Sequence, residues 1–221
     1  KRIPDIVDVW FESGIASFAP LHYPFENKEL LEEMYPMDYI TEGSDQIRGW
    51  FYSLMFCGVM AFDERPYDKV MLSAFVLDED GNKMSKSKGN VIDPRDLLDQ
   101  YGADLPRFYV LWTSSPWDNP RIDSEEIESE IYRLFSVYWN SVDFLRTYQH
   151  EEAQKSLEDL DQRLKPIDNW ILSRINKLTE EAAEHYDRNQ HHHLARGIED
   201  FILNDLSRWY IKSVRKRAKK G

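Results

Sequence analysis

The fold is decided by the stretch Met37-Asp38-Tyr39-Ile40-Thr41-Glu42-Gly43-Ser44-Asp45-Gln46. Its apolar beginning predicts a short strand, and the polar cluster from Glu42 to Asp45 predicts a tight turn. After Gln46 the apolar residues recur at helical spacing, which predicts a helix to about Phe62. Ser44 or Asp45 suits the N-cap of that helix, because either side chain can accept a hydrogen bond from a first-turn amide. The stretch therefore predicts strand, turn and helix in succession.

A second apolar run, Val70 to Val76, follows the helix and has the pattern of a buried strand. Strand, helix and strand in this order predict a parallel sheet. In such sheets ligands bind beyond the carboxyl ends of the strands. Glu42 and Asp45 would lie at such an end, where Glu42 suits a substrate ammonium and Asp45 and Gln46 suit ribose hydroxyls.

The second half of the chain is helical in pattern. Apolar stripes predict one helix from Asp123 to about Leu145, with Asp123 and Glu126 as a capping pair. After a charged link over 149–166, two more helices are expected near Asp168 and Leu194. Three amphipathic helices imply a bundle. The fold class is therefore α/β, followed by an α-helical bundle.

Composition excludes several classes of protein. The 221 residues contain no apolar run of about 18, so a membrane span is disfavoured. The chain starts at Lys1 without an apolar leader, which favours a truncated cytoplasmic protein. Cys57 is the only cysteine, so an internal disulfide and a cysteine-rich zinc site are both excluded, and a small buried role is expected for it.

Charge is distributed unevenly. The net charge is −12, yet residues 208–221 hold seven Lys or Arg side chains and no acid. This end either meets phosphate or is a solvated, frayed basic terminus, and the pattern alone leaves both interpretations open.

The most specific motif is the lysine loop, Lys83-Met84-Ser85-Lys86-Ser87-Lys88-Gly89-Asn90. Three ammonium groups within six residues repel one another, so they need a polyanion or open solvent. The serines offer donors to phosphate oxygens, and Gly81 and Gly89 bracket the loop as hinges. Such a loop suits a lid over a triphosphate, where Lys83 and Lys86 would stabilise developing charge.

Lys83 to Ser87 resembles the second signature of the class I aminoacyl-tRNA synthetases. Glu42 to Phe51 resembles the corresponding stretch of the isoleucyl-tRNA synthetases, and Trp10 to Gly14 resembles their Trp-Phe-Asp-Ser-Gly with one conservative change. Tyr52 and Ser115-Pro116-Trp117-Asp118 lean towards the archaeal and eukaryotic style of that family. Asp168 to Leu172 and Asp205 to Tyr210 resemble the opening of its anticodon-binding domain.

The resemblance implies the C-terminal half of a Rossmann-like catalytic domain over 1–92, a stem-contact-like connection over 93–122 and the start of an anticodon-binding domain over 123–221. It implies that the enzyme forms isoleucyl-adenylate from isoleucine and ATP, assisted by Mg²⁺, and transfers the isoleucyl group to tRNA(Ile). The ATP residues would be Lys83, Met84, Ser85, Lys86 and Ser87, with Lys83 and Lys86 catalytic. The adenylate residues would be Glu42, Gly43, Asp45 and Gln46. Trp10 and Trp50 would be walls for the isoleucine side chain.

The sequence also departs from that family. The first signature, His-x-Gly-His, is missing, and nothing resembles the editing domain, so the missing N-terminal half of the polypeptide is an expected partner and the fragment alone is expected to be inactive. Ser73-Ala74 and Leu105-Pro106-Arg107 differ from the usual residues at their places. His191-His192-His193 is expected to be a solvated turn, because adjacent helical residues point in different directions and suit no shared metal. No protein-bound zinc or other metal is expected.

Three alternatives remain open. The first is a valyl-type enzyme, from the family nearest to the isoleucyl enzymes, although its equivalent stretch typically has Gly-Phe-Asp-Ile in place of the residues from Glu42. A free-standing nucleotide-binding or tRNA-binding module derived from a synthetase is the second alternative. The third is an α/β and helical protein whose lysine loop binds nothing.

Overall fold

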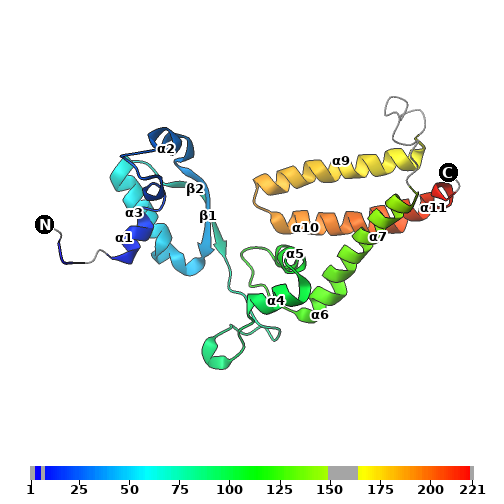
Figure 1. Cartoon of the computed structure of the whole chain (residues 1–221), viewed down its shortest axis with the longest axis horizontal. Coiled ribbons are helices and arrows are strands. Elements are labelled where there is room, and N and C mark those ends of the chain that lie inside the picture. The colour runs from blue at the N-terminus through cyan, green and yellow to red at the C-terminus, as the bar shows by residue number, and fades with distance from the viewer. Residues whose placement is uncertain (1–2, 6–7, 149–163, 220–221) are drawn as a thin grey trace. The chain divides into compact units, whose positions relative to one another are not determined.

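The computed structural model describes residues 3–5, 8–148 and 164–219. The chain divides into two compact units (Figure 1). The first comprises Lys1–Phe75 with Pro116–Asn119, and the second comprises Val76–Ser115 with Pro120–Gly221. Each unit has an apolar core cluster of its own, and the domain boundaries expected at 92 and 122 remain predictions.

The first unit is a strand-helix-strand motif preceded by short helices. Its elements are α1 (Val9–Gly14), η1 (Ala19–Leu21), α2 (Lys28–Met34), β1 (Met37–Gly43), η2 (Ser44–Arg48), α3 (Trp50–Phe62) and β2 (Tyr67–Ser73). β1 and β2 pair in parallel from Met37 opposite Tyr67 to Gly43 opposite Ser73. Ile40 packs with Phe51 and Leu54 of α3, so an apolar cluster holds the crossover helix on the sheet. The predicted parallel arrangement is confirmed.

β2 differs from the buried strand that the sequence predicts. It ends at Ser73, three residues early, and Val70, Leu72, Phe75 and Val76 are 37% to 45% exposed. The described sheet contains two strands, and so neighbouring strands cover little of β2. The apolar pattern does mark a strand, but the burial it predicts needs partners that the described residues do not supply.

The second unit contains the lysine loop and the helices. Its elements are η3 (Lys86–Lys88), α4 (Pro94–Tyr101), α5 (Asp104–Thr113), α6 (Ser124–Glu126), η4 (Ile127–Tyr132), α7 (Arg133–Tyr148), α9 (Pro166–Asp187), α10 (His191–Asp200), η6 (Phe201–Ile211) and α11 (Lys212–Ala218). The residues from Arg95 to Tyr101 predict a short helix ending at Gly102, and α4 confirms it, whereas α5 was not predicted. Pro106 is accommodated because it lies in the first turn of α5, where few amide donors have intrahelical partners.

Tyr109 of α5 is the centre of the core beside the lysine loop. It is 0% exposed and packs with Ile122, Ile127 and Ile131. Its hydroxyl lies 2.6 Å from a carboxylate oxygen of Glu126 and 3.0 Å from the carbonyl of Arg121. Burial, and then the hydrogen bond to Glu126, raise the pKa of Tyr109 to about 12.

One of the two hydrogen bonds expected of the capping pair at the start of the long helix is present. Asp123 accepts a hydrogen bond from the amide of Glu126 at 3.1 Å. The Glu126 carboxylate does not return to Asp123 but accepts from Tyr109, because that hydroxyl needs a partner once it is buried. The predicted link over 149–166 lies mostly outside the described residues, and α9 already begins at Pro166.

The His191 to His193 segment is the first turn of α10 rather than a solvated turn. His192 is 3% exposed, whereas His193 faces solvent. Because three consecutive histidines are polar, the sequence did not indicate that a helix begins there. In a helix, however, one residue in each turn can face the neighbouring helix. Within the described residues no group of three or more His, Cys, Asp and Glu side chains is arranged to hold a metal ion.

A buried carboxylate ties the last helices together. Asp168, 5% exposed, accepts hydrogen bonds from the Lys165 amide at 2.9 Å, from the Tyr210 hydroxyl at 3.0 Å and from the guanidinium of Arg217. Burial alone would raise the pKa of Asp168, but these partners, with Arg217 foremost, hold it below its usual range. α9, η6 and α11 are thereby joined at one end.

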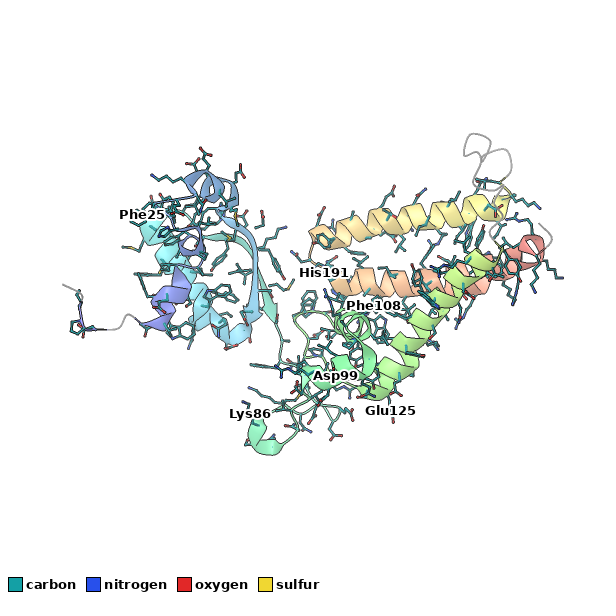
Figure 2. The ribbon with its side chains drawn as sticks, viewed as in Figure 1. Phe25, Lys86, Asp99, Phe108, Glu125 and His191 are labelled. Atoms are coloured by element: carbon teal, nitrogen blue, oxygen red, sulfur yellow. The ribbon has the colours of Figure 1, made fainter. Side chains whose placement is uncertain are left out.

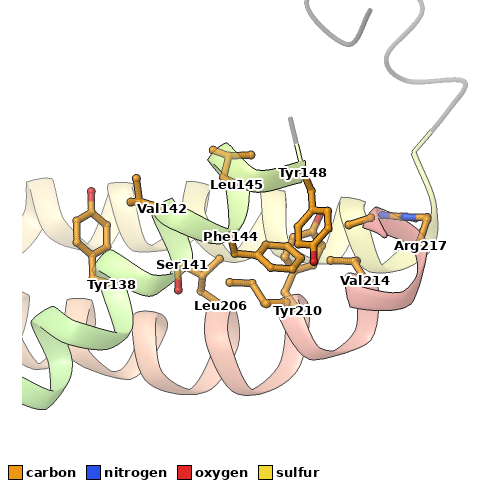
Figure 3. A pocket seen from close by; sticks show the side chains of 12 residues that line it. Tyr138, Ser141, Val142, Phe144, Leu145, Tyr148, Leu206, Tyr210, Val214 and Arg217 are labelled. Carbon is orange, nitrogen blue, oxygen red and sulfur yellow. The ribbon is translucent and has the colours of Figure 1, made fainter. Parts of the chain in front are cut away.

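A groove of about 520 Å³ lies between α7 and the continuous η6–α11 helix (Figure 3). Apolar and aromatic side chains line most of it, including Leu145, Tyr148 and Leu206, and Arg217 reaches one end. None of the predicted site residues lines this groove. In the part of the chain that the structure describes, no helix has the length and apolar character needed to cross a membrane.

Candidate functional site

The first candidate site is the turn between β1 and α3, which we call the adenylate turn (Glu42 to Trp50). Glu42 and Gly43 end β1, and the neighbouring β2 ends beside them at Ser73. The hydroxyls of Thr41 and Ser73 are 3.3 Å apart at this edge. The predicted polar residues therefore lie at the carboxyl ends of two parallel strands, where ligands of such sheets bind.

The turn is more elaborate than the sequence predicts. η2 covers Ser44–Arg48, and α3 starts only at Trp50, four residues later than expected. Neither Ser44 nor Asp45 caps α3. Instead, the Gln46 side-chain oxygen accepts from the Trp50 amide at 3.0 Å, while the Gln46 side-chain amide donates to Asp45 at 2.8 Å. Gln46 thus fixes both the helix start and the Asp45 carboxylate.

Glu42 is exposed, and its carboxylate folds back to accept a hydrogen bond from the Gly43 amide at 3.0 Å. Gly43 leaves room for the turn, since a Cβ at this position would lie 2.5 Å from Asp45 Oδ1. Asp45 is also exposed, so both carboxylates face solvent at the strand ends.

The two predicted tryptophans lie beside this turn. The Trp50 indole N–H donates to the carbonyl of Ser13 at 3.0 Å, which joins α3 to α1. Trp10 is 47% exposed and lies against Gly49. A Cβ added to Gly49 would be 3.2 Å from two atoms of the Trp10 ring. The structure therefore brings Trp10, Trp50, Asp45 and Gln46 together within the first unit.

α1 was not predicted, yet it carries Trp10. It begins after Asp8, whose carboxylate accepts from the Trp10 amide at 2.8 Å. Gly14 allows α1 to approach α3 closely, since a Cβ there would lie 2.9 Å from both Cys57 Sγ and the Ser53 carbonyl. Cys57 is 7% exposed, which confirms its expected role as a small buried residue, and burial raises the pKa of its thiol.

The second candidate site is the lysine loop, in the other unit. It projects beyond α4, with Lys86 on its short η3 turn (Figure 2). Lys86 and Lys88 are exposed, and neither forms an ion pair with a carboxylate of the described residues. Gly81 and Gly89, the predicted hinges, have φ values of 79° and 69°, which suit glycine. The loop therefore presents at least two unneutralised ammonium groups.

A side-chain clamp that residue patterns do not reveal closes the base of this loop. The side-chain amide of Asn90 donates to Asp78 at 2.7 Å, and its oxygen accepts from the Ser85 amide at 2.9 Å. The hydrogen bonds from Asn90, and then from the Asn82 backbone, hold the pKa of Asp78 below its usual range. The residue types of Asp78 and Asn90 predict only turn or loop positions. They do not predict that the two side chains pair, because the pairing depends on the backbone conformation of the loop.

Ser85 and Ser87 bring their hydroxyls within 3.3 Å of each other, and Met84 turns its sulfur towards the Ile92 amide at 3.4 Å. Met84 therefore anchors the loop on the protein while the serines remain at its surface. Lys83 lies where the loop leaves the short antiparallel bridge to Leu77. Backbone pairing thus fixes the first lysine, whereas the second sits on the projecting turn.

Sequence comparisons match both parts of the chain. The family described as tRNA synthetases class I (I, L, M and V) matches residues 1–123, and the anticodon-binding domain of tRNA ligase matches residues 168–221. Similar relatives are the isoleucine–tRNA ligases of Methanothermobacter marburgensis (47% identical over 99% of this chain), Methanopyrus kandleri (44%, 99%) and Bacteroides fragilis (43%, 98%). The chain spans about a fifth of their lengths: 21%, 22% and 19%.

Solved structures agree in fold. Mycobacterium tuberculosis methionyl-tRNA synthetase in complex with methionyl-adenylate matches 97% of this chain and 42% of its own, with a TM-score of 0.74 and 20% identity. Agrobacterium radiobacter LeuRS, in a ternary complex with tRNA and LeuAMS, matches 98% of this chain and 32% of its own, with a TM-score of 0.57 and 20% identity. At such identities the likeness concerns the fold alone.

Proposed function

The chain belongs to the class I tRNA synthetases of the isoleucine, leucine, methionine and valine group, and we propose that it is the part of an isoleucine–tRNA ligase that carries the lysine loop. One observation carries this proposal: the chain is 47% identical, over 99% of its length, to an isoleucine–tRNA ligase. The full-length protein would form isoleucyl-adenylate and then isoleucyl-tRNA(Ile). A cytoplasmic location is part of the same proposal.

In the first step a carboxylate oxygen of isoleucine attacks the α-phosphorus of ATP, and pyrophosphate leaves with the bonding electron pair. Negative charge builds on the bridging oxygen and the leaving group. Exposed ammonium groups on the lysine loop suit this charge, so we assign transition-state stabilisation to Lys83 and Lys86. Met84, Ser85 and Ser87 would support the phosphates through the loop backbone and the hydroxyls.

The adenylate turn would hold the other end of the product. Glu42 would pair with the isoleucine ammonium, and Asp45 and Gln46 would accept and donate hydrogen bonds at the ribose. Gly43 keeps the backbone open at the strand end. Trp10 and Trp50, which lie beside the same turn, would form apolar walls for the branched side chain.

Mg²⁺ would enter with the ATP phosphates, since this ion is usually held by substrate oxygens and water with only one or two carboxylates. Its chemistry there is charge neutralisation on the phosphates. tRNA(Ile) would bind through the helical part, which matches the anticodon-binding family over 168–221.

Replacing Lys86 by Ala in the full-length protein tests the proposal. Loss of a charge that acts mainly in the transition state is expected to lower isoleucine-dependent ATP–pyrophosphate exchange by about 10²–10³-fold. Lys177→Ala is the matched control, because Lys177 is an exposed lysine of α9 paired only with Glu181 in a surface ion pair. Wild-type exchange by the Lys86→Ala protein would contradict the proposal, and exchange driven by valine rather than isoleucine would favour the valyl alternative.

A further inference from the structure

α10 is tied to the end of α5 by three side-chain hydrogen bonds. Arg196 donates from Nε to the Trp112 carbonyl at 2.9 Å and from Nη2 to the Thr113 carbonyl at 3.1 Å. The Trp112 indole N–H donates to Glu199 at 2.5 Å. Arg196 and Glu199 are three residues apart, so they lie on one face of α10. The bonds join segments 83 to 87 residues apart in the chain.

These bonds fix the last turn of α5. The final carbonyls of a helix have no partner within the helix, and Ser114 already has extended backbone angles. The planar guanidinium of Arg196 can satisfy two carbonyls at once, and its positive charge is favourable at a helix C-terminus. Removal of Arg196 or Glu199 would therefore free the end of α5.

Tyr109 lies one helical turn before Trp112 on α5, and it links the helix to the segment around Arg121. The Tyr109 hydroxyl lies 3.0 Å from the Arg121 carbonyl, and Tyr109 shares with Ile122 a core cluster against which Ile92 packs. Because Tyr109 is fully buried, a shift of α5 has to move these neighbours with it.

Both ends of the lysine loop contact either the segment around Arg121 or the core cluster of Tyr109. The Leu77 amide donates to the Pro120 carbonyl at 2.8 Å, the Ile122 amide donates to the Leu77 carbonyl at 3.1 Å, and Leu77 pairs antiparallel with Lys83. At the exit of the loop, the Ile92 amide contacts Met84. A continuous set of contacts therefore runs from α10 through α5 to the first lysine of the loop and to its exit.

We propose that Arg196 and Glu199 are positioning residues for the lysine loop, acting through α5. The inference rests on the proposed function of that loop in ATP chemistry. Within the described structure neither residue belongs to the loop or to the adenylate turn, so their removal leaves every contact proposed for isoleucine and ATP present. It degrades only the alignment of the loop, to which phosphate transfer is sensitive because catalysis there depends on positioning.

The test uses the full-length protein with Glu199→Leu, Trp112→Phe and the double variant. Each single change removes the same hydrogen bond, so each is expected to lower kcat for isoleucine-dependent ATP–pyrophosphate exchange about five- to tenfold, with the isoleucine KM unchanged. The double variant should be no worse than either single one, because they break one interaction. Glu199→Gln keeps an acceptor for the indole and should recover most of the wild-type rate.

Variants of Arg196 provide an independent test of the same inference. Arg196→Ala should lower exchange by a similar factor, and Arg196→Lys should recover part of it by serving one of the two carbonyls. Arg188→Ala and Glu181→Gln are matched controls, since each alters an exposed ion pair elsewhere on these helices, and both should behave like wild type. Hydrogen exchange over residues 83–92 should become faster in Arg196→Ala and Glu199→Leu.

Unchanged kcat and unchanged loop hydrogen exchange in Glu199→Leu and Arg196→Ala would overturn the inference, even if the melting temperature fell. Effects of Glu199→Leu and Trp112→Phe that multiply in the double variant would also overturn it. A wild-type protein without isoleucine-dependent exchange would instead remove the proposed function, and the positioning role with it. The two failures are thus distinguishable from the wild-type measurement.

Discussion

Single side chains set the geometry at both candidate sites. Asn90 holds the base of the lysine loop through three hydrogen bonds: its side chain donates to Asp78 and to the Lys83 carbonyl and accepts from the Ser85 amide. Gln46 does the same at the adenylate turn, where it caps α3 and orients Asp45. In each case an amide side chain is used, because it can donate and accept at once.

Replacing Asn90 by Ala is expected to release the base of the lysine loop. The change removes three hydrogen bonds, each worth about 1 kcal/mol, so the ATP KM in pyrophosphate exchange should rise by about tenfold or more while the isoleucine KM changes little. Asn140→Ala, at an exposed position on α7, is the control and should leave both constants unchanged. An unaltered ATP KM in Asn90→Ala would show that the clamp does not order the loop.

Replacing Gly49 by Ala is expected to disturb the isoleucine pocket rather than the lysine loop. The new Cβ would lie 2.7 Å from the Gln46 side-chain oxygen and 3.2 Å from the Trp10 ring, so one of the two has to move. Overpacking of this kind costs about 1–3 kcal/mol. The isoleucine KM should therefore rise at least about fivefold, measured by pyrophosphate exchange, and the ATP KM should rise with it because Gln46 is assigned to the ribose. A rise confined to the ATP KM would contradict the assignment of Trp10 to the pocket.

At the scale of elements, periodicity located most helices and both strands, but not their ends. α3 begins late because η2 and Gly49 intervene. Its first amide donates to the side chain of Gln46, a residue type that sequence rules do not choose for an N-cap. α5 was not predicted, and Leu105-Pro106-Arg107 was noted only as a departure from the family's usual residues. A proline in the first helical turn costs little, and only the structure shows that Pro106 lies there.

The candidate site was predictable to a similar degree. The lysines, Glu42, Asp45 and the two tryptophans belong to motifs, so residue type and order suffice to select them. The Asp78–Asn90 clamp and the contact of Trp10 with Gly49 depend on backbone geometry, and no pattern of residue types encodes them. The roles assigned to all these residues stay predictions until substrates are measured.

The Asp168 cluster makes a prediction about the helical elements. Asp168→Ala leaves Arg217 and the half-buried Tyr210 hydroxyl without their acceptor. Removing one partner of a buried pair costs about 3–5 kcal/mol, and because the Arg217 side chain is 39% exposed we expect about 2 kcal/mol. Hydrogen-exchange protection at the start of α9 should fall roughly thirtyfold. Glu180→Ala, at an exposed site on α9, should leave the protection unchanged.

The same cluster predicts a pH dependence. Burial opposes the charge of Asp168, but Arg217 and the other donors outweigh it, so the folded-state pKa lies below the unfolded value. The stabilisation is therefore fully present above about pH 4 and is lost as the pH falls through the folded-state pKa. The difference in α9 protection between wild type and Asp168→Ala should shrink below about pH 4. A difference that stayed constant through that range would assign the effect to packing instead of charge.

On the scale of the whole chain, charge separates the acidic body from the basic end. The net charge is −12, yet four exposed basic residues follow one another at spacings of four, three and four: Arg208, Lys212, Arg215 and Lys219. This spacing gathers them on one face of the η6–α11 helix. Arg217 is excluded from that face because it is bound to Asp168. The helix continues to Ala218, so the interpretation of this segment as frayed is wrong for the described residues.

A basic stripe on an acidic protein restricts where a polyanion can bind, and this leads to the last prediction. If tRNA(Ile) binds along this face, the double variant Lys212→Ala/Arg215→Ala of the full-length protein should weaken tRNA binding at low salt. Each phosphate contact that is lost should also reduce the slope of log K against log salt concentration by about 1, so this double variant should reduce it by about 2. The control Lys177→Ala/Arg188→Ala removes two exposed charges already paired with acids and should change neither quantity. Equal salt slopes for wild type and the Lys212→Ala/Arg215→Ala protein would mean that the phosphates lie elsewhere, because a contact that releases no counterions contributes nothing to that slope.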